Sequence, residues 1–137
     1  MSGRVFIDTN VFIYMYADNE PEKQQLSIKV IDNADHCITS TQVLNEISNV
    51  MQRKWKLPFE AIRQVQKDIR QICEVVQVSE HTINLALDLC ERYGYSYYDC
   101  LVLSSAVEND CDIIYTEDLS DGQNIFDKTK IVNPFEM

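Results

Sequence analysis

Four carboxylates of this 137-residue chain occupy positions where a merely solvating charge is unusual. Two follow short apolar runs with strand character, and two share a helical face with apolar residues; in chain order they are Asp8, Glu46, Asp99 and Asp118. Ionised carboxylates brought together repel one another, which raises their pKa values or requires a cation between them. Oxygen-rich acidic sites suit Mg²⁺ or Mn²⁺, which retain waters and bind phosphate oxygens.

Each carboxylate also has a plainer structural explanation. Asp8 can cap a helix that begins near Asn10, because aspartate is among the best N-cap residues. Ser96 and Asp99 have the spacing of a capping box, and Asp118 has the position of a turn residue. Taken singly, these explanations are favoured over catalysis. Their joint occurrence favours one shared site.

The elements that would bring these carboxylates together alternate between strands and helices. Short apolar runs predict strands near residues 4–8, 36–38, 74–78, 112–115 and 130–132. Helical spacing and capping residues predict helices over residues 10–16, 21–33, 42–55, 57–72, 79–93 and 96–108. This alternation predicts a three-layer α/β/α sandwich around a mainly parallel sheet of four to five strands, in one domain over residues 1–137. Helices after parallel strands begin at the carboxyl edge of the sheet, where all four carboxylates are then expected.

Helical periodicity also predicts which side chains face the core. In the helix over residues 79–93, the expected inward residues are Ile83, Ala86, Leu87, Cys90 and Tyr93. In the helix over residues 57–72, they are Ile62, Val65, Ile69 and Ile72.

The composition is that of an ordinary globular protein, with 45% hydrophobic and 25% charged residues. Five cysteines without a C-x-x-C pair are expected to be reduced side chains of an intracellular, cytoplasmic protein. No signal-peptide pattern is recognisable and no apolar run is long enough to span a bilayer, so no membrane partner is expected. The net charge of −10 argues against a generic electrostatic nucleic-acid binder, but not against an enzyme that binds nucleic acid through metal ions.

Four segments resemble, in order and approximate spacing, the motifs of the PIN-domain family, and especially its small bacterial or archaeal VapC-like members. They are Phe6-Ile7-Asp8-Thr9-Asn10-Val11, Leu44-Asn45-Glu46, Ser96-Tyr97-Tyr98-Asp99-Cys100-Leu101-Val102 and Tyr115-Thr116-Glu117-Asp118-Leu119. A lone Asp-Thr-Asn is a weak signal, but the ordered set spans almost the whole chain. The resemblance implies an acidic metal site of Asp8, Glu46, Asp99 and Asp118, supported by Thr116 and by Thr9 or Asn10.

The last motif departs from the family pattern. Many relatives resemble T-x-D-x-D-F, whereas this chain reads Thr116-Glu117-Asp118-Leu119-Ser120-Asp121-Gly122. The second aspartate, Asp121, is therefore displaced. We place Asp121 below the other four carboxylates as a metal ligand.

What the resemblance implies is a Mg²⁺- or Mn²⁺-dependent endoribonuclease. Asp8, Asp99 and Glu46 would hold a first ion, and Asp118 would complete the site or bridge to a second. A VapC-like toxin would inhibit translation by cutting tRNA, rRNA or mRNA, would have a cognate antitoxin and would form a homodimer. Six of the twelve basic residues fall between positions 53 and 70. Such charges ordinarily solvate a helix, yet on an acidic chain Arg53, Lys54 and Lys56 are the best candidates for contacting RNA.

Other functions remain open at this point. A haloacid dehalogenase-type phosphotransferase would need a second acid two residues after its nucleophile, where this chain has Asn10, which cannot transfer the proton. A receiver domain would need a lysine near a late strand end, whereas Lys128 and Lys130 precede the last predicted strand. A non-catalytic regulatory protein with the same fold, and a free-standing RNA-processing nuclease without an antitoxin, are the remaining alternatives.

Overall fold

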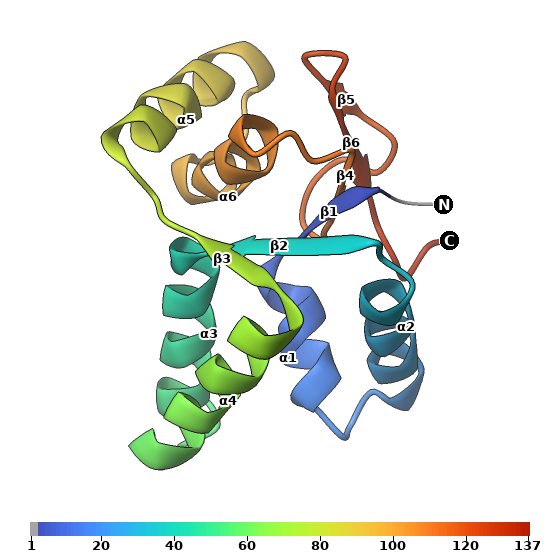
Figure 1. The fold of residues 1–137 in the computed structure, drawn as a ribbon, viewed down its shortest axis with the longest axis vertical. Helices are drawn as coiled ribbons and strands as arrows, with labels where there is room; N and C mark the ends of the chain where they lie inside the picture. The colour runs from blue at the N-terminus through green and yellow to red at the C-terminus, as the bar shows by residue number, and fades with distance from the viewer. Residues whose placement is uncertain (1–2) are drawn as a thin grey trace.

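The computed structural model describes residues 3–137, and strands alternate with helices along this part of the chain (Figure 1). The elements are β1 (Arg4–Ile7), α1 (Thr9–Tyr16), α2 (Pro21–Asp32), β2 (His36–Ser40), α3 (Thr41–Arg53), α4 (Phe59–Ile72), β3 (Glu74–Val76), α5 (Glu80–Tyr93), α6 (Tyr97–Glu108), β4 (Ile113–Tyr115), β5 (Asn124–Ile125) and β6 (Thr129–Val132). Each predicted strand and helix is present within a few residues of its expected ends. No helix in the described part is both long and apolar enough to cross a membrane.

The strands form one sheet in the order β3-β2-β1-β4-β6-β5. All neighbouring pairs are parallel except β5 with β6, which are antiparallel. The chain starts at β1 in the middle, moves outward to β2 and β3, and then crosses to β4 on the other side of β1. The carboxyl ends of β1 and β4 are thus a topological switch point, where open α/β sheets bind their ligands.

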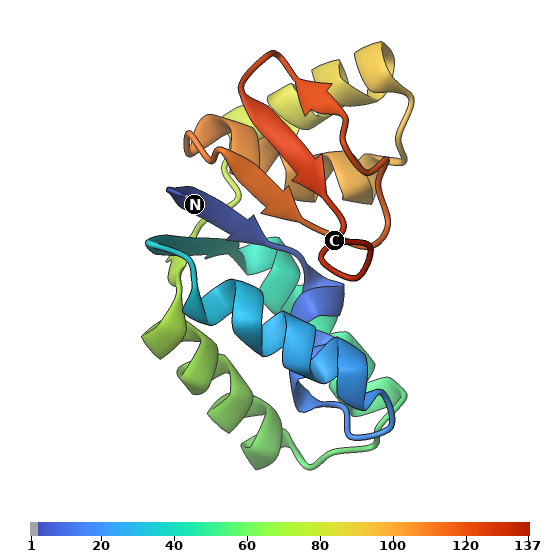
Figure 2. The same ribbon diagram turned by 90° about the vertical axis from the view of Figure 1, so that its right-hand side faces the viewer.

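Helices cover both faces of this sheet. Helices α1 to α4 lie on one side of β1 to β3, and α5 with α6 lie on the other side (Figures 1 and 2). The predicted α/β/α sandwich with a mainly parallel sheet is confirmed. The sheet also contains the short edge strand β5, which the sequence did not predict because two residues in a turn-rich segment show no periodicity.

Short polar residues fix where the site-bearing helices begin. The side chains of Ser40, Ser79 and Ser96 each accept a backbone N–H in the first turn of α3, α5 and α6. Gly94 ends α5 in the left-handed region with φ 78°, a conformation that is free of steric cost for glycine. Because α1 and α3 directly follow β1 and β2, their first turns stand at the carboxyl edge of the sheet.

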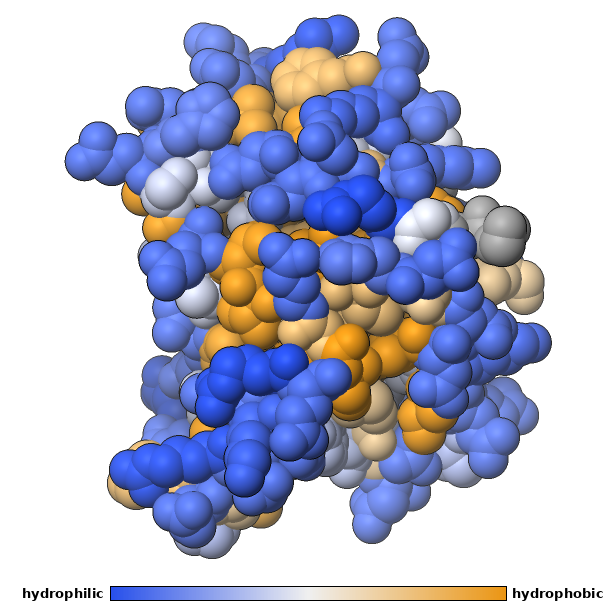
Figure 3. All heavy atoms as spheres, viewed as in Figure 1, coloured by the Kyte–Doolittle hydropathy of each residue, from blue (hydrophilic) through white to orange (hydrophobic). Residues whose placement is uncertain are grey.

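The core is a single cluster of buried apolar side chains among the described residues. Strand β1 lies at its centre, and Val5, Phe6 and Ile7 are fully buried. Every residue from 100 to 107 in α6 is buried, because this helix packs between α5 and the sheet. Over the β2–β3 edge, hydrophobic side chains reach the surface, whereas α4 presents a polar outer face (Figure 3).

Two predictions of the buried faces were wrong in part. In α5, Ile83 and Leu87 are exposed, and Thr82 and Leu89 are buried instead. The face of α5 that packs on α6 is therefore rotated relative to the apolar stripe, and the buried Thr82 hydroxyl donates to Glu108 of α6 at 2.5 Å.

In α4, Ile62, Val65 and Ile69 are buried as predicted, but Ile72 is exposed. Ile72 is the last residue of the helix, where the chain turns toward β3 and leaves the buried face.

Candidate active site

Asp8 and Thr116 meet at the switch point of the sheet. The Asp8 N–H donates to the Tyr115 carbonyl at 3.1 Å, which extends the pairing of β1 with β4 by one step. The Thr116 hydroxyl Oγ1 donates to Asp8 Oδ2 at 2.7 Å, and both side chains are buried. The Thr9 N–H donates to Asp8 Oδ1 at 2.7 Å, so Asp8 is also the N-cap of α1. Capping and membership of an acidic site therefore coexist in one side chain.

Burial raises the pKa of Asp8 to about 7, although hydrogen bonds from Thr116 and Thr9 act to lower it. The nearby carboxylates of Glu46 and Asp118 raise the pKa further. Among residues 3–137, no lysine or arginine offsets this effect. Asp8 is thus a buried carboxyl group that faces other acids without a protein cation.

Glu46 approaches Asp8 from the second turn of α3. Its Oε1 accepts a 2.7 Å hydrogen bond from Thr9 Oγ1, and its Oε2 accepts a 3.1 Å bond from Gln42 Nε2. Val43 and Ile47 on the same helix are fully buried, which holds the Glu46 turn against the core. Glu46 itself is half-buried, at the rim of that apolar face.

Asp118 lies in the loop after β4. Asn10 Nδ2 donates to Asp118 Oδ2 at 2.9 Å, and the Asn10 Oδ1 accepts the Glu117 N–H at 3.3 Å. The Asp118 N–H donates to Thr116 Oγ1 at 3.2 Å, so the same hydroxyl links Asp118 to Asp8. Burial raises the pKa of Asp118, and the Asp99 carboxylate raises it further, which places these two acids within electrostatic reach.

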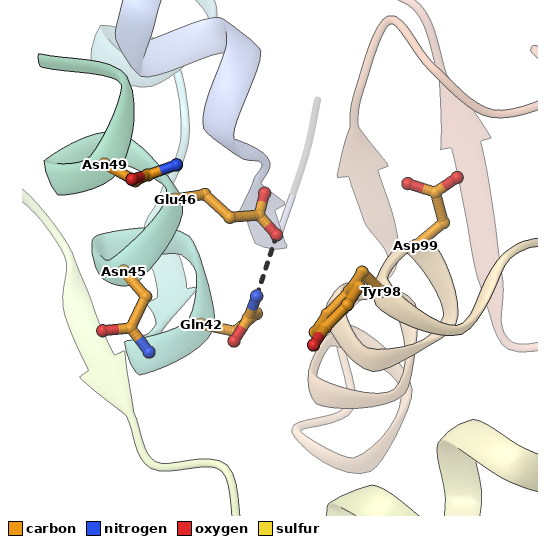
Figure 4. A pocket seen from close by; sticks show the side chains of 6 residues that line it. All are labelled: Gln42, Asn45, Glu46, Asn49, Tyr98 and Asp99. Carbon is orange, nitrogen blue, oxygen red and sulfur yellow. Dashed lines mark hydrogen bonds between the residues drawn. The ribbon is translucent and has the colours of Figure 1, made fainter. Parts of the chain in front are cut away.

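Asp99 stands across a hollow from Glu46. It is half-buried in the first turn of α6, and Ser96 Oγ donates to its Oδ2 at 2.9 Å. The hollow has a volume of about 580 Å³, and Glu46 and Asp99 lie on its opposite walls (Figure 4). The deep burial of α6 begins only one residue later, at Cys100, so Asp99 lies at the rim of the core.

Each of the three polar residues named beside the acids donates a hydrogen bond to one of them. Thr116 donates to Asp8, Thr9 donates to Glu46, and Asn10 donates to Asp118. Asp121, in contrast, is exposed and accepts the Asn133 N–H at 2.8 Å. The structure brings Asp121 into no contact with the four carboxylates among the described residues.

Sequence reasoning missed a cluster around Glu117. Lys23 Nζ of α2 lies 2.7 Å from Glu117 Oε2, and the Tyr14 hydroxyl donates to Glu117 Oε1 at 2.8 Å. Lys23 also donates to the Tyr14 hydroxyl at 3.2 Å, and the Tyr14 ring packs edge-on against Phe135 at 5.1 Å. This cluster ties the Asp118 loop to α1 and α2. Lys23 and Glu117 are 94 residues apart, so no local pattern could have revealed it. Gln42, four residues before Glu46, was detectable as an i,i+4 pair.

The three predicted RNA contacts differ in their surroundings. Arg53, Lys54 and Lys56 are all exposed. Only Lys54 of these three lines a hollow of about 470 Å³ that also contains Glu46 and Asp118 in its wall.

The chemistry of the donors fits a hard divalent cation. The buried Asp8 faces Glu46 and Asp118 and has no protein cation to offset the repulsion, which an ion such as Mg²⁺ would do. Within residues 3–137, no three side chains of aspartate, glutamate, histidine or cysteine converge closely enough to hold one ion together. Mg²⁺ is commonly held by one or two carboxylates, with waters in its other positions. The donor set therefore fits a partly hydrated ion.

The fold and this acidic edge define a class of protein. The family model of the PIN domain matches residues 5–121, and the chain belongs to that family. No curated protein matches the sequence.

Solved structures of toxins share the fold. VapC20 of Mycobacterium tuberculosis, a Sarcin-Ricin loop cleaving toxin, is 16% identical with a TM-score of 0.65, over 83% of this chain and 89% of that chain. VapBC2 of Rickettsia felis, bound to a DNA fragment from its promoter, is 17% identical with a TM-score of 0.65, over 95% and 99% of the two chains. A toxin-antitoxin complex from Klebsiella pneumoniae is 15% identical with a TM-score of 0.67, over 95% and 97%.

Proposed function

We propose that this protein is a VapC-like endoribonuclease that hydrolyses RNA phosphodiester bonds with Mg²⁺ or Mn²⁺. The observation that carries the proposal is the buried Asp8–Thr116 pair at the switch point, with acids from two other segments, Glu46 and Asp118, close to it. A structural carboxylate at this depth would normally be paired with a cation of the protein. Asp8 instead faces Glu46 and Asp118, an arrangement that suits a bound metal ion.

In this proposal, Asp8, Glu46 and Asp99 would surround the first ion, one or two of them binding it directly and the rest through its waters, and Asp118 would complete the site or hold a second ion. A bound ion lowers the pKa of its water and neutralises charge on the scissile phosphate. Thr9, Asn10 and Thr116 orient the carboxylates through the hydrogen bonds described above, which is the usual role of groups behind metal ligands.

The proton of Asp8 is part of the same chemistry. With a pKa of about 7, Asp8 is substantially protonated at neutral pH when no cation is present. Carboxylate ligands bind metals in the deprotonated form. Asp8 must therefore release its proton to bind an ion, and we expect metal affinity to rise with pH.

The biological role that we propose is that of a toxin. It would cut tRNA, rRNA or mRNA, inhibit translation, bind a cognate antitoxin and act as a homodimer. The support is the shared fold over 95% of this chain with two toxin-antitoxin complexes. Expression of the protein should arrest growth, and co-expression of a small reading frame encoded next to it should restore growth. Normal growth on expression of an active nuclease would favour a free-standing RNA-processing enzyme.

The direct test is RNA cleavage by purified variants. Wild-type protein should cleave one of three RNA pools (total tRNA, ribosomes or an mRNA transcript) in Mg²⁺ or Mn²⁺ and be silenced by EDTA. Asp8→Asn and Asp99→Asn should each lose about 100-fold or more of this activity, since loss of groups that merely orient ligands already costs 10- to 100-fold. Asp88→Asn, an exposed change on α5, should remain fully active. Undiminished cleavage by folded Asp8→Asn would refute the assignment.

One observation favours a second candidate. The four acids do not converge as three ligands of one ion within the described residues, which suits a regulatory PIN-fold protein without turnover. Metal binding without cleavage of any of the RNA pools, at every Mn²⁺ concentration, would support that alternative.

A further inference from the structure

A second hollow borders the acidic site. Its volume of about 470 Å³ falls in the usual range of ligand pockets. Glu46, Asp118, Lys54 and Trp55 are among the residues that line it. Trp55 also lines a neighbouring hollow of about 320 Å³ together with Tyr16. The indole is therefore a wall that two adjoining concavities share, next to the carboxylates.

The backbones of Lys54 and Trp55 are held at the end of α3, and the Trp55 ring packs in part against the core. Their N–H groups both donate to the Val50 carbonyl, at 2.8 and 3.2 Å, which holds them at the end of α3. Neither side chain forms a hydrogen bond or an ion pair with the rest of residues 3–137. Trp55 is half-buried and Lys54 is exposed. The ammonium group and the exposed part of the indole thus lie at the margin of an acidic site.

The two side chains complement the two parts of a nucleotide. An indole face stacks on an unpaired base of any sequence, and an ammonium group binds a phosphate. Stacking in such a concavity requires a base that is splayed out of a helix, because the bases of a duplex are stacked on one another. Glu46 and Lys54 are eight residues apart on α3, about 12 Å along its axis. This spacing along the backbone leaves room for a phosphate at Lys54 next to the one at the carboxylates.

We propose that this hollow binds one unpaired nucleotide of the RNA substrate, with its base stacked on Trp55 and its phosphate at Lys54. The inference rests on the proposed ribonuclease function and assigns Trp55 and Lys54 as the residues that hold the RNA beside the carboxylates. It also gives a chain of net charge −10 a contact with RNA that does not depend on the metal ion.

The binding test uses intrinsic fluorescence. Trp55 is the single tryptophan of the chain, so the tryptophan emission reports on the indole that lines this hollow. In Mg²⁺, an unstructured RNA 12-mer added to the Asp8→Asn variant should shift or quench the emission, and a duplex of the same sequence should not. Lys54→Gln should weaken this binding about tenfold, as expected for loss of a charged phosphate contact. Lys67→Gln, an exposed change on α4 away from the hollow, is the matched control. Unchanged emission with single-stranded RNA would overturn the proposal.

The kinetic test separates stacking from catalysis. Trp55→Ala should raise KM about tenfold and leave kcat unchanged, because stacking contributes equally to the ground state and the transition state. Trp55→Phe, which keeps an aromatic face, should restore most of the loss. An unchanged KM for Trp55→Ala would overturn the nucleotide site and leave the nuclease standing. RNA-dependent emission without any cleavage would support the nucleotide site while refuting the nuclease. A change in Trp55 emission on addition of a protein partner, but not on addition of RNA, would identify a protein-docking site and overturn the proposal.

Discussion

Two aspartates at opposite edges of the sheet, Asp110 and Asp8, have opposite electrostatic surroundings. At the amino edge, Asp110 Oδ1 lies 2.6 Å from Lys128 Nζ, and this contact lowers the pKa of Asp110. At the carboxyl edge, burial and neighbouring acids raise the pKa of Asp8 to about 7, and no protein cation opposes them. The difference shows that the same residue type is neutralised at one edge and left without a counter-ion at the other. Acids without counter-ions stand where the topology of the sheet predicts a ligand.

The largest expected effect is on the free energy of unfolding of the metal-free protein, measured in EDTA as a function of pH. Because the folded pKa of Asp8 is raised, its contribution to stability is complete below the unfolded pKa of 3.8 and is lost as pH rises through about 7. Asp8→Asn, which mimics the protonated form, should therefore match wild type near pH 4. Above pH 7 it should be more stable than wild type, by on the order of 4 kcal/mol. Urea unfolding at a series of pH values measures this difference.

The amino edge supplies the control for this prediction. The lowered pKa of Asp110 has the opposite sign, so its contribution is present above the unfolded pKa and is lost as pH falls. Asp110→Asn should therefore not gain stability over wild type at high pH. If the unfolding free energies of the wild type and Asp8→Asn changed with pH in the same way, Asp8 would not differ from Asp110 in the manner described.

The next effect concerns the buried threonines of the two edges. Thr116 donates to the Asp8 carboxylate at 2.7 Å, and Thr129 donates to the Cys111 carbonyl at 2.7 Å; both are fully buried. Thr116→Val and Thr129→Val should each cost about 1–3 kcal/mol of unfolding free energy, because each leaves a buried acceptor without its donor. Only Thr116→Val should also weaken Mn²⁺ binding, by about 10-fold or more. Equal Mn²⁺ affinities in the two variants would remove the distinction.

The smallest effect is expected for the amino-edge ion pair. Lys128 and Asp110 are largely exposed, so solvent screens their attraction. Lys128→Met should leave the urea midpoint within error of wild type at neutral pH and in high salt. A clear loss of stability would show that the amino edge depends on its ion pair more than its exposure allows.

The sequence predicted the strands and helices that carry the four acids better than it predicted the packing around them, and the role of these acids as metal ligands stays a prediction. The apolar runs before Asp8 and Asp118 and the periodic helices around Glu46 and Asp99 were sufficient to place all four acids at one edge. That inference needed only the alternation of strands and helices and the rule for parallel sheets. Whether Asp8 acts as a cap or a site residue was not decidable locally, because the structure realises the cap and the acidic neighbours together.

What the sequence could not predict depends on contacts between distant segments. Exposure of Ile83 and Leu87 follows from the way α5 docks on α6, which its own apolar pattern does not encode. The contact of Lys23 with Glu117 and the position of Trp55 beside the carboxylates likewise arise only when separate helices and loops pack together.

The central claim is that the carboxyl edge binds a divalent cation through Asp8. Calorimetric titration of Mn²⁺ into wild type, Asp8→Asn and Asp110→Asn, in two buffers of different ionisation enthalpy, tests it most directly. We predict that wild type and Asp110→Asn bind Mn²⁺ with the same affinity and release protons near neutral pH. Asp8→Asn should bind Mn²⁺ at least about 10-fold more weakly and should release no proton from this position. Equal Mn²⁺ affinity and equal proton release in Asp8→Asn would contradict the account.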